Sequence, residues 1–556
     1  MTSPGTRSGW PWILAAGTAS LVVAVPVAVI FASIFRSSGG DWSHLASTRL
    51  STYASNTIQL ALGVGLISSV VGVGVAWLLV TCRFPGSRIL GWAQLLPLAV
   101  PAYLSAYAMS DLLQFSGPVQ GWIRESFRLQ AGDYWFPTIR SMGGAIFVLS
   151  FALYPYVYFT ARVAFLEQSQ ALLESSRTLG RGPLKTFLLV GLPLARPAIA
   201  GGIMLVLMET VADFGAVDHL AVDTFATGIY RTRYALASPV AAAQLSSVLL
   251  TAVFMVLAFE RLLRRGRRYH RTESRSLSRR RKRLGPASGT AVFVLCSVPV
   301  LLGFLLPASR LVQLAIESGD SRGTGYLLAL ARDTATVSLL AACVAVLLSL
   351  VIGYASRVRP GRSTTAVRGI ARAGYAIPGP VIALGLLLPL GWIDHRLNDA
   401  WTTWLGADSR PGLVLTGSVV ALVIGYQTRF LAVGLSMVQI GLSRIHQNVD
   451  DAARVLGSGP FGSLLRVHVP LLRRSLLVAG LLVFVDVAKE LPMTLMLRPF
   501  NFDTLAVRVY ELASDERLGE ASTAALLIVL VGMLPVVLLA RQLERGFGSG
   551  KERDES

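Results

Sequence analysis

The chain has 556 residues, of which 53% are hydrophobic and 15% are charged, and its mean hydropathy is +0.58. Soluble domains carry about 25% charged residues, so this composition excludes an ordinary soluble protein and indicates a membrane protein. The formal net charge of +20 does not by itself indicate nucleic-acid binding, because basic loops of membrane proteins are retained on the cytoplasmic side.

Twelve apolar runs are long enough to cross a hydrocarbon core about 30 Å thick, which takes roughly 20 helical residues. Backbone groups in lipid must be satisfied within their own segment, so these runs should be helices. The predicted fold class is an all-α polytopic membrane protein with about 12 transmembrane helices. The expected spans lie near residues 12–35, 57–81, 91–113, 143–166, 197–217, 240–262, 289–312, 334–356, 370–393, 412–437, 475–497 and 520–541.

A basic segment joins the sixth and seventh spans. Between Arg261 and Arg283 there are 12 Lys or Arg residues and one acid, Glu273, which places this segment in the cytoplasm. Attraction to anionic lipid headgroups explains its charge better than nucleic-acid binding does. Strict alternation of the spans then puts both chain termini in the cytoplasm and the loop at 394–411 outside.

An internal repeat divides the chain. Residues 174–196 and 451–473 are identical at ten of 23 positions, and one fixed offset, which takes Gly180 to Gly457, relates the two stretches. We call this spacing the repeat offset. An even number of spans in each half gives two parallel six-helix repeats, with an axis along the membrane normal. The predicted parts are a first six-helix half at 1–262, a basic cytoplasmic linker at 263–288, and a second six-helix half at 289–556.

Each repeated stretch predicts a short helix, a turn and a second short helix. An acid at the start favours a helix N-terminus. Gly180 and Gly457 permit the turn, and Pro183 and Pro460 suit the first turn of the next helix. Neither stretch has a catalytic constellation. One copy alone is as well explained by a structural loop, but two equivalent copies favour presentation to a cytosolic partner.

The two stretches resemble a family signature. The pattern E-A-A, three residues, G, nine residues, I-x-L-P is typical of permease subunits of binding-protein-dependent ABC importers, and its spacing is kept in both stretches, although Ser and Asp replace some family residues. The resemblance implies a type I importer with the MetI-like permease fold. It also implies that residues 174–193 and 451–470, the first and second coupling loops, rest on ATP-hydrolysing subunits. The matching residues are Glu174, Ser175, Ser176, Gly180 and Pro193 in the first loop and Asp451, Ala452, Ala453, Gly457 and Pro470 in the second.

The chain itself lacks the residues for ATP hydrolysis. A P-loop requires G-x-x-x-x-G-K-[ST], and none of the four lysines ends such a segment. We therefore expect no enzymatic activity in this chain, with ATP and Mg²⁺ bound by two copies of a partner ATPase. The six histidines are scattered, so no metal site or cofactor is predicted.

Two pairs of acids lie deep in predicted spans. Glu209 and Asp213, and Asp486 and Glu490, are each spaced i, i+4 and so predict one shared helical face. Charged groups at such depth cost about 2.5 kcal/mol or more, so they should face the protein interior. Two interpretations stay open: the four acids line a path or gate for a cation, or they form internal pairs, as Lys489 allows for Asp486.

A narrower resemblance concerns the substrate. Residues 484–511 and 153–158 are similar to the corresponding stretches of ferric iron importer permeases, which have two fused six-helix halves. This resemblance implies import of Fe(III), delivered by an extracytoplasmic binding protein, across the bacterial cytoplasmic membrane. Thiamine or another small solute is the alternative substrate. A secondary transporter that uses its buried carboxylates is a further alternative.

Overall fold

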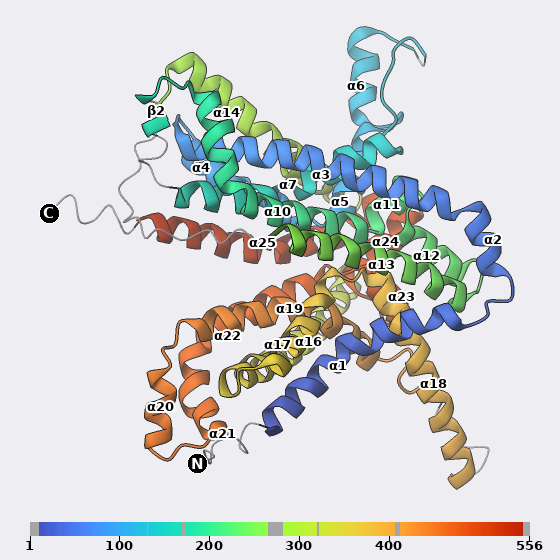
Figure 1. Ribbon diagram of the computed structural model, residues 1–556. Coiled ribbons are helices and arrows are strands. Elements are labelled where there is room, and N and C mark those ends of the chain that lie inside the picture. The colour runs from blue at the N-terminus through green and yellow to red at the C-terminus, as the bar shows by residue number, and fades with distance from the viewer. Residues whose placement is uncertain are drawn as a thin grey trace. The chain divides into compact units, whose positions relative to one another are not determined.

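The computed structural model describes residues 10–130, 132–168, 174–176, 178–264, 282–319, 322–405 and 412–548 (Figure 1). Within these ranges the chain is helical apart from one short strand pair, so the all-α prediction is confirmed. Most of the predicted linker, part of the predicted outer loop, Arg177 and both chain ends lie outside the described residues.

Most of the predicted spans are present as single long helices. Ten helices in the described ranges are long and apolar enough to cross a membrane. The span expected at 91–113 is instead a pair of segments bent by 94°, with Pro101 at the break, because a proline disfavours a helical conformation in the residue before it. The span expected at 475–497 is also interrupted, between Ala488 and Pro492.

The helices form two compact units, and each is made of residues from both halves of the sequence. The first unit comprises Met1–Ser47, Gly228–Thr251 and Arg322–Glu511. Its central helices α16, α19 and α22 pack against one another, and α1 from the chain's beginning packs on α16, α17 and α18 (Figure 1). Its elements are α1 (Trp10–Ala32), η2 (Ser33–Phe35), α2 (Asp41–Thr48), most of α12 (Phe225–Tyr234), the first part of α13 (Pro239–Arg264), α16 (Gly323–Val358), α17 (Arg362–Ala373), η6 (Gly374–Ala376), α18 (Gly379–Leu405), α19 (Val419–Ser443), α20 (Asn448–Val455), α21 (Pro460–Ser463), η8 (Leu464–His468), α22 (Val469–Ala488), α23 (Pro492–Leu497) and most of α24 (Leu505–Ser514).

The second unit comprises Thr48–Thr227, Ala252–Ser321 and Leu512–Ser556. Here α3, α7 and α10 are the packed centre, and α25 packs on α15 and η3. The short strand pair joins Cys82 to Lys282 and Arg83 to Arg283 in parallel register. Its elements are α3 (Leu50–Thr81), β1 (Cys82–Arg83), α4 (Ser87–Ala93), η3 (Leu96–Ala99), α5 (Ala102–Leu113), α6 (Pro118–Phe127), α7 (Met142–Glu167), α9 (Pro183–Thr186), η4 (Phe187–Gly191), α10 (Leu192–Ala212), α11 (Gly215–His219), β2 (Lys282–Arg283), α14 (Pro286–Val300), η5 (Leu301–Leu305), α15 (Leu306–Glu317) and α25 (Leu518–Gly548).

The sequence repeat recurs in the secondary structure with the same spacing. The first residues of α7 and α19 are separated by the repeat offset, and so are those of α9 and α21, η4 and η8, and α10 and α22. The central triad α3, α7 and α10 is therefore the counterpart of α16, α19 and α22. The predicted halves describe this repeat along the chain, whereas each compact unit adds end helices from the opposite half.

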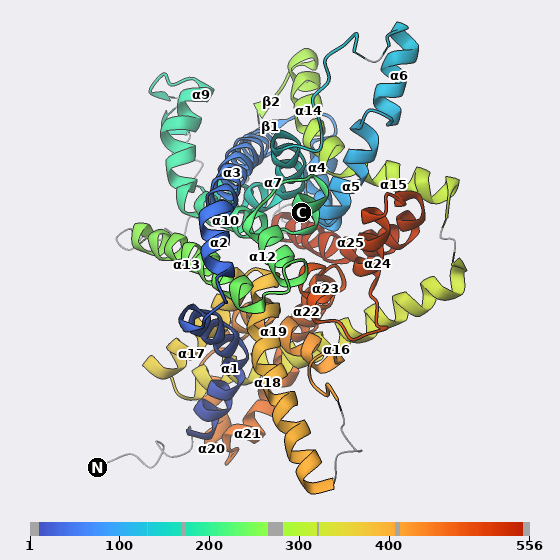
Figure 2. The ribbon, with the colours of Figure 1, turned by 90° about the vertical axis from the view of Figure 1, so that its right-hand side faces the viewer.

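The loop expected at 394–411 begins as helix, because α18 continues to Leu405. Asp394 on this helix is fully buried. Its carboxylate accepts hydrogen bonds from the backbone amides of Val414, Leu415 and Thr416, at 3.1, 2.8 and 2.7 Å. These bonds hold the returning chain against α18, whose far end projects from the helices of its unit (Figure 2).

Gly72 allows α3 to pack closely against α7 in the second unit. A Cβ added at Gly72 would lie 2.8 Å from the backbone nitrogen of Tyr158 and 2.9 Å from Cβ of Val157. Backbone atoms cannot move aside as a flexible side chain does, so the two helices would have to separate.

We therefore expect Gly72→Ala to lower the free energy of unfolding by about 1–3 kcal/mol, the usual cost of overpacking. Gly74→Ala, on the same helix, is the matched control, because nothing lies within 4 Å of its added Cβ. Thermal unfolding of the purified protein in detergent measures both variants. Equal midpoints for the two would contradict this account of the α3–α7 contact.

Candidate functional site

The second coupling loop forms a helix, a turn and a second helix, as its sequence predicts. Helix α20 has Asp450 and Asp451 in its first turn, where carboxylates interact favourably with the helix dipole. Gly457 then takes the left-handed conformation with φ of 77°, which a residue with a Cβ resists. After this turn, Pro460 begins α21.

The first coupling loop has the same turn. Gly180 has φ of 75°, and the amide of Arg181 donates to the carbonyl of Ser176 at 3.2 Å. Helix α9 follows from Pro183. The hydroxyls of Ser176 and Thr186 are buried and 3.2 Å apart, so they join the two limbs of the loop.

A π-helical segment near the end of each coupling loop connects its short second helix, α9 or α21, to the long helix that follows. The segments η4 and η8 end just before α10 and α22, whose second residues are Pro193 and Pro470. Proline has no amide hydrogen and its ring clashes with the carbonyl four residues earlier. The wider π turn accommodates this defect, and such turns are common at functional sites. The predicted prolines thus mark the junction between loop and membrane helix.

Both coupling loops expose large apolar side chains at equivalent positions. Leu179 and Leu184 in the first loop are 76% and 68% exposed, and their counterparts Leu456 and Phe461 are 85% and 65% exposed. Exposed apolar side chains of this kind are more typical of protein interaction sites than of a folded core. The acids Glu174 and Asp451 stand at the start of these surfaces.

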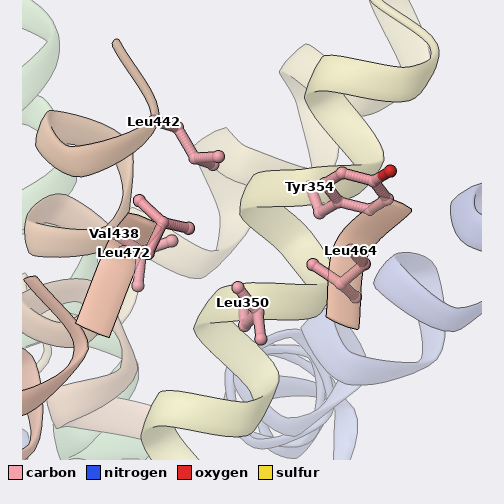
Figure 3. Close-up of a cluster of buried hydrophobic side chains, with 6 residues drawn as sticks. All are labelled: Leu350, Tyr354, Val438, Leu442, Leu464 and Leu472. Atoms are coloured by element: carbon pink, nitrogen blue, oxygen red, sulfur yellow. The ribbon is translucent and has the colours of Figure 1, made fainter. Parts of the chain in front are cut away.

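The second coupling loop is supported by a buried apolar cluster in its unit (Figure 3). Tyr354 from α16 donates its hydroxyl hydrogen to the carbonyl of Pro460 at 2.8 Å. The sequence prediction did not identify this residue, although the repeat offset pairs it with another large aromatic residue, Trp77, and so offered a signal. The cluster members are Leu350, Tyr354, Val438, Leu442, Leu464 and Leu472.

Two of the four membrane acids cap short helices. Asp213 accepts from the amides of Ala216 and Val217 at 3.0 and 3.1 Å, at the start of α11. Glu490 accepts from the amides of Met493 and Thr494 at 3.0 and 2.9 Å, at the start of α23. Each carboxylate therefore satisfies amides that lipid would leave without an acceptor.

The predicted shared helical face is wrong for both pairs. Helix α10 ends at Ala212 and α22 at Ala488, so the second acid of each pair lies beyond its helix. Asp486 forms an ion pair with Lys489 at 3.0 Å, and Glu209 lies partly buried on α10. The helix caps and this ion pair favour the structural interpretation.

The described residues contain no group of three or more His, Cys, Asp or Glu side chains that could hold a metal ion. The candidate acids are consequently not gathered into a resident metal centre within these ranges. Each coupling loop, with its π turn and the long helix after it, forms one continuous unit that ends with α10 in the first half and α22 in the second. We call these two units the levers.

Comparison with known proteins gives these levers a context. Residues 345–549, which include the second coupling loop, match the family described as "Binding-protein-dependent transport system inner membrane component". Residues 345–549 are therefore a permease domain of this transport family, and the chain over most of its length resembles a permease of the same kind.

Individual relatives of this permease differ in their named substrates. The Fe(3+)-transport system permease protein FbpB 2 of Haemophilus influenzae is 25% identical over 498 residues, covering 89% of this chain and 90% of the relative. The sulfate transport system permease protein CysT of Synechocystis is 27% identical over 267 residues, covering 47% of this chain and 90% of the relative. A probable sulfate permease of Chlorokybus atmophyticus is 29% identical over 219 residues, covering 39% of this chain and 73% of the relative.

The capping role of Asp213 leads to a test of the two interpretations of the acids. Asp213→Asn keeps an oxygen that accepts from α11, so the stability of the permease should stay near wild type. Asp213→Ala removes the cap and should cost about 1 kcal/mol. Thermal unfolding measures both variants, and substrate uptake is measured beside it. Normal stability with lost uptake in Asp213→Asn would favour the path interpretation over capping alone.

Proposed function

We propose that this permease forms the transmembrane path of an ATP-driven importer for ferric iron. The observation that carries the proposal is the pair of equivalent loops, each exposing apolar residues next to a matched triad of membrane helices. The ferric iron permease that aligns with 89% of the chain supports the substrate. An external binding protein would deliver the iron, and the chain would pass it to the cytoplasm.

ATP hydrolysis belongs to a separate subunit in this proposal. Two coupling loops of the same geometry require two copies of one ATPase, one on each loop. Closure of the ATPases around ATP would move the two coupling loops, and the π turns would pass that movement to α10 and α22. The path would then open alternately to the two sides of the bacterial cytoplasmic membrane, with both chain termini in the cytoplasm.

A second candidate substrate is an oxyanion such as sulfate. The sulfate permeases among the relatives favour it. Arg429 on α19 is a cation that is 8% exposed, and its charge interacts with the carboxylate of Glu490. A charged side chain within a membrane span commonly marks a substrate pathway or a structural pair, so sulfate uptake is measured beside iron uptake.

The coupling loops provide the first test. Leu179→Glu combined with Leu456→Glu should abolish copurification of the ATPase and ATP-driven uptake, because two carboxylates would be buried in apolar grooves. The permease should still fold, since both leucines are exposed. Trp135→Glu, at an equally exposed position on the expected outer side, is the control. Retained ATPase binding in the double variant would refute the coupling assignment.

The substrate is tested by uptake of radioactive ferric iron into vesicles that hold the permease, its ATPase and its binding protein. Iron should enter only with ATP, and excess sulfate or thiamine should not compete. ATP-driven uptake of sulfate without iron uptake would replace the ferric iron proposal by the oxyanion one. Uptake that needs an ion gradient but no ATPase would instead indicate a secondary transporter.

A further inference from the structure

A single arginine joins three segments beneath the second coupling loop. Arg357, in the last turn of α16, donates from Nε to Oδ2 of Asp450 at 2.7 Å. Its two terminal nitrogens donate to the carbonyls of Leu442 at 2.7 Å and Ile445 at 2.8 Å. These carbonyls lie at the end of α19, where a cation also interacts favourably with the helix dipole. Arg357 thus binds α16 to the end of α19 and to the start of α20.

The other oxygen of Asp450 extends the network to the membrane helix after the loop. Oδ1 lies 2.9 Å from Nε2 of His468, which is fully buried at the end of η8, and the two groups form an ion pair when the ring is protonated. Nδ1 of the same ring is 3.1 Å from the carbonyl of Ser463. The ring also packs edge-on against Tyr354, with centroids 5.1 Å apart. Asp450 therefore connects α16, through Arg357, with η8 and α22, through His468.

The first half holds its loop by different contacts, which include a hydrogen bond from the side-chain amide of Gln168 to the carbonyl of Gly191 at 2.8 Å. The repeat offset places Val80, Leu173 and Gly191 where the second half has Arg357, Asp450 and His468, and Leu173 lies outside the described residues. Trp77 replaces Tyr354, and its ring packs on Phe165 and Phe187 with centroids 5.1 and 5.0 Å away. Gly191 makes room for this ring, since a Cβ there would lie 2.6 Å from it.

The two kinds of contact differ in stiffness. Arg357 and Asp450 are each 15% exposed, and charge-assisted bonds with several donors fix both distance and direction. Breaking one of them leaves a largely buried charge without its partner, which is costly. Apolar packing, as around Trp77, is non-directional and tolerates sliding of the packed groups.

We propose that Arg357 and Asp450 are positioning residues that make the second coupling loop move as one body with α16 and α22. A displacement of this loop by the ATPase then reaches both helices through the ion pair. This inference rests on the proposed ATP-driven function and names the residues that carry the displacement in the second half.

The test compares uptake with ATP hydrolysis in the full complex of permease, ATPase and binding protein in proteoliposomes. Asp450→Asn and Arg357→Lys should each lower the amount of substrate imported per ATP hydrolysed by about 5-fold or more, the lower end of typical coupling between sites. The ATPase should still copurify, because neither side chain is on the exposed surface. The double variant should lose no more than the stronger single one, because residues of one network are not additive.

Asp333→Asn, which removes an exposed ion pair with Arg332 on the same helix α16, is the matched control and should change uptake per ATP much less. Wild-type uptake per ATP in Asp450→Asn with bound ATPase would overturn the inference. So would an equal loss in Asp333→Asn. A wild-type complex without ATP-driven uptake would refute the proposed function itself, which separates the two failures.

Tyr354→Phe is the second variant in case Asp450→Asn does not fold. It removes only the hydroxyl that bonds to Pro460 and keeps the ring against His468. It should reduce uptake per ATP, while the thermal midpoint falls only slightly because a single hydrogen bond is lost. Normal coupling in this variant, together with misfolded Asp450→Asn, would assign the network a purely structural role and overturn the inference.

Discussion

The need to satisfy every backbone amide in an apolar surrounding governs this fold, and it is most demanding where a helix ends among buried residues. Both halves break their fifth helix, after Ala212 and after Ala488. In both, a carboxylate just past the break accepts from amides of the next short helix. Without Asp213 and Glu490 these amides would face an apolar surrounding with no acceptor. The breaks are possible because each one has its own acid.

The two breaks stand at the far ends of helices whose near ends carry the coupling loops. Proline forces a π turn between loop and helix at the same register in both halves. Each coupling loop thus leads through a π turn into one continuous helix, and that helix has an internal proline, Pro197, in the first half. In the proposed importer these helices would carry a displacement of the loops toward the path.

Duplication has not kept the halves equivalent. The turn glycines, the prolines and the exposed apolar positions match at a fixed spacing, but the contacts beneath the loops do not. One loop rests on an ion-pair network and the other on a packed tryptophan and two hydroxyls. Identical partner subunits would thus contact two loops that have similar surfaces but are supported by different contacts. The compact units add to this, since each takes its outer helices from the opposite half.

The sequence by itself determined the features that depend on neighbouring residues. Apolar length predicted most of the spans because lipid thickness sets that length, and Gly457 and Pro460 predicted the turn because backbone sterics are local. The i, i+4 spacing predicted that Asp213 and Glu490 share a helical face with their partners. This was wrong, because the residues next to these acids give no signal that the helix ends before them. Only the tertiary structure decided which distant groups meet. Arg357 and Asp450 are 93 residues apart, and no pattern in the sequence indicated that the two side chains meet. Their pairing depends on how α16, α19 and α22 pack, because side-chain hydrogen bonds act over about 3 Å, and the spacing of a repeat carries no information on such contacts.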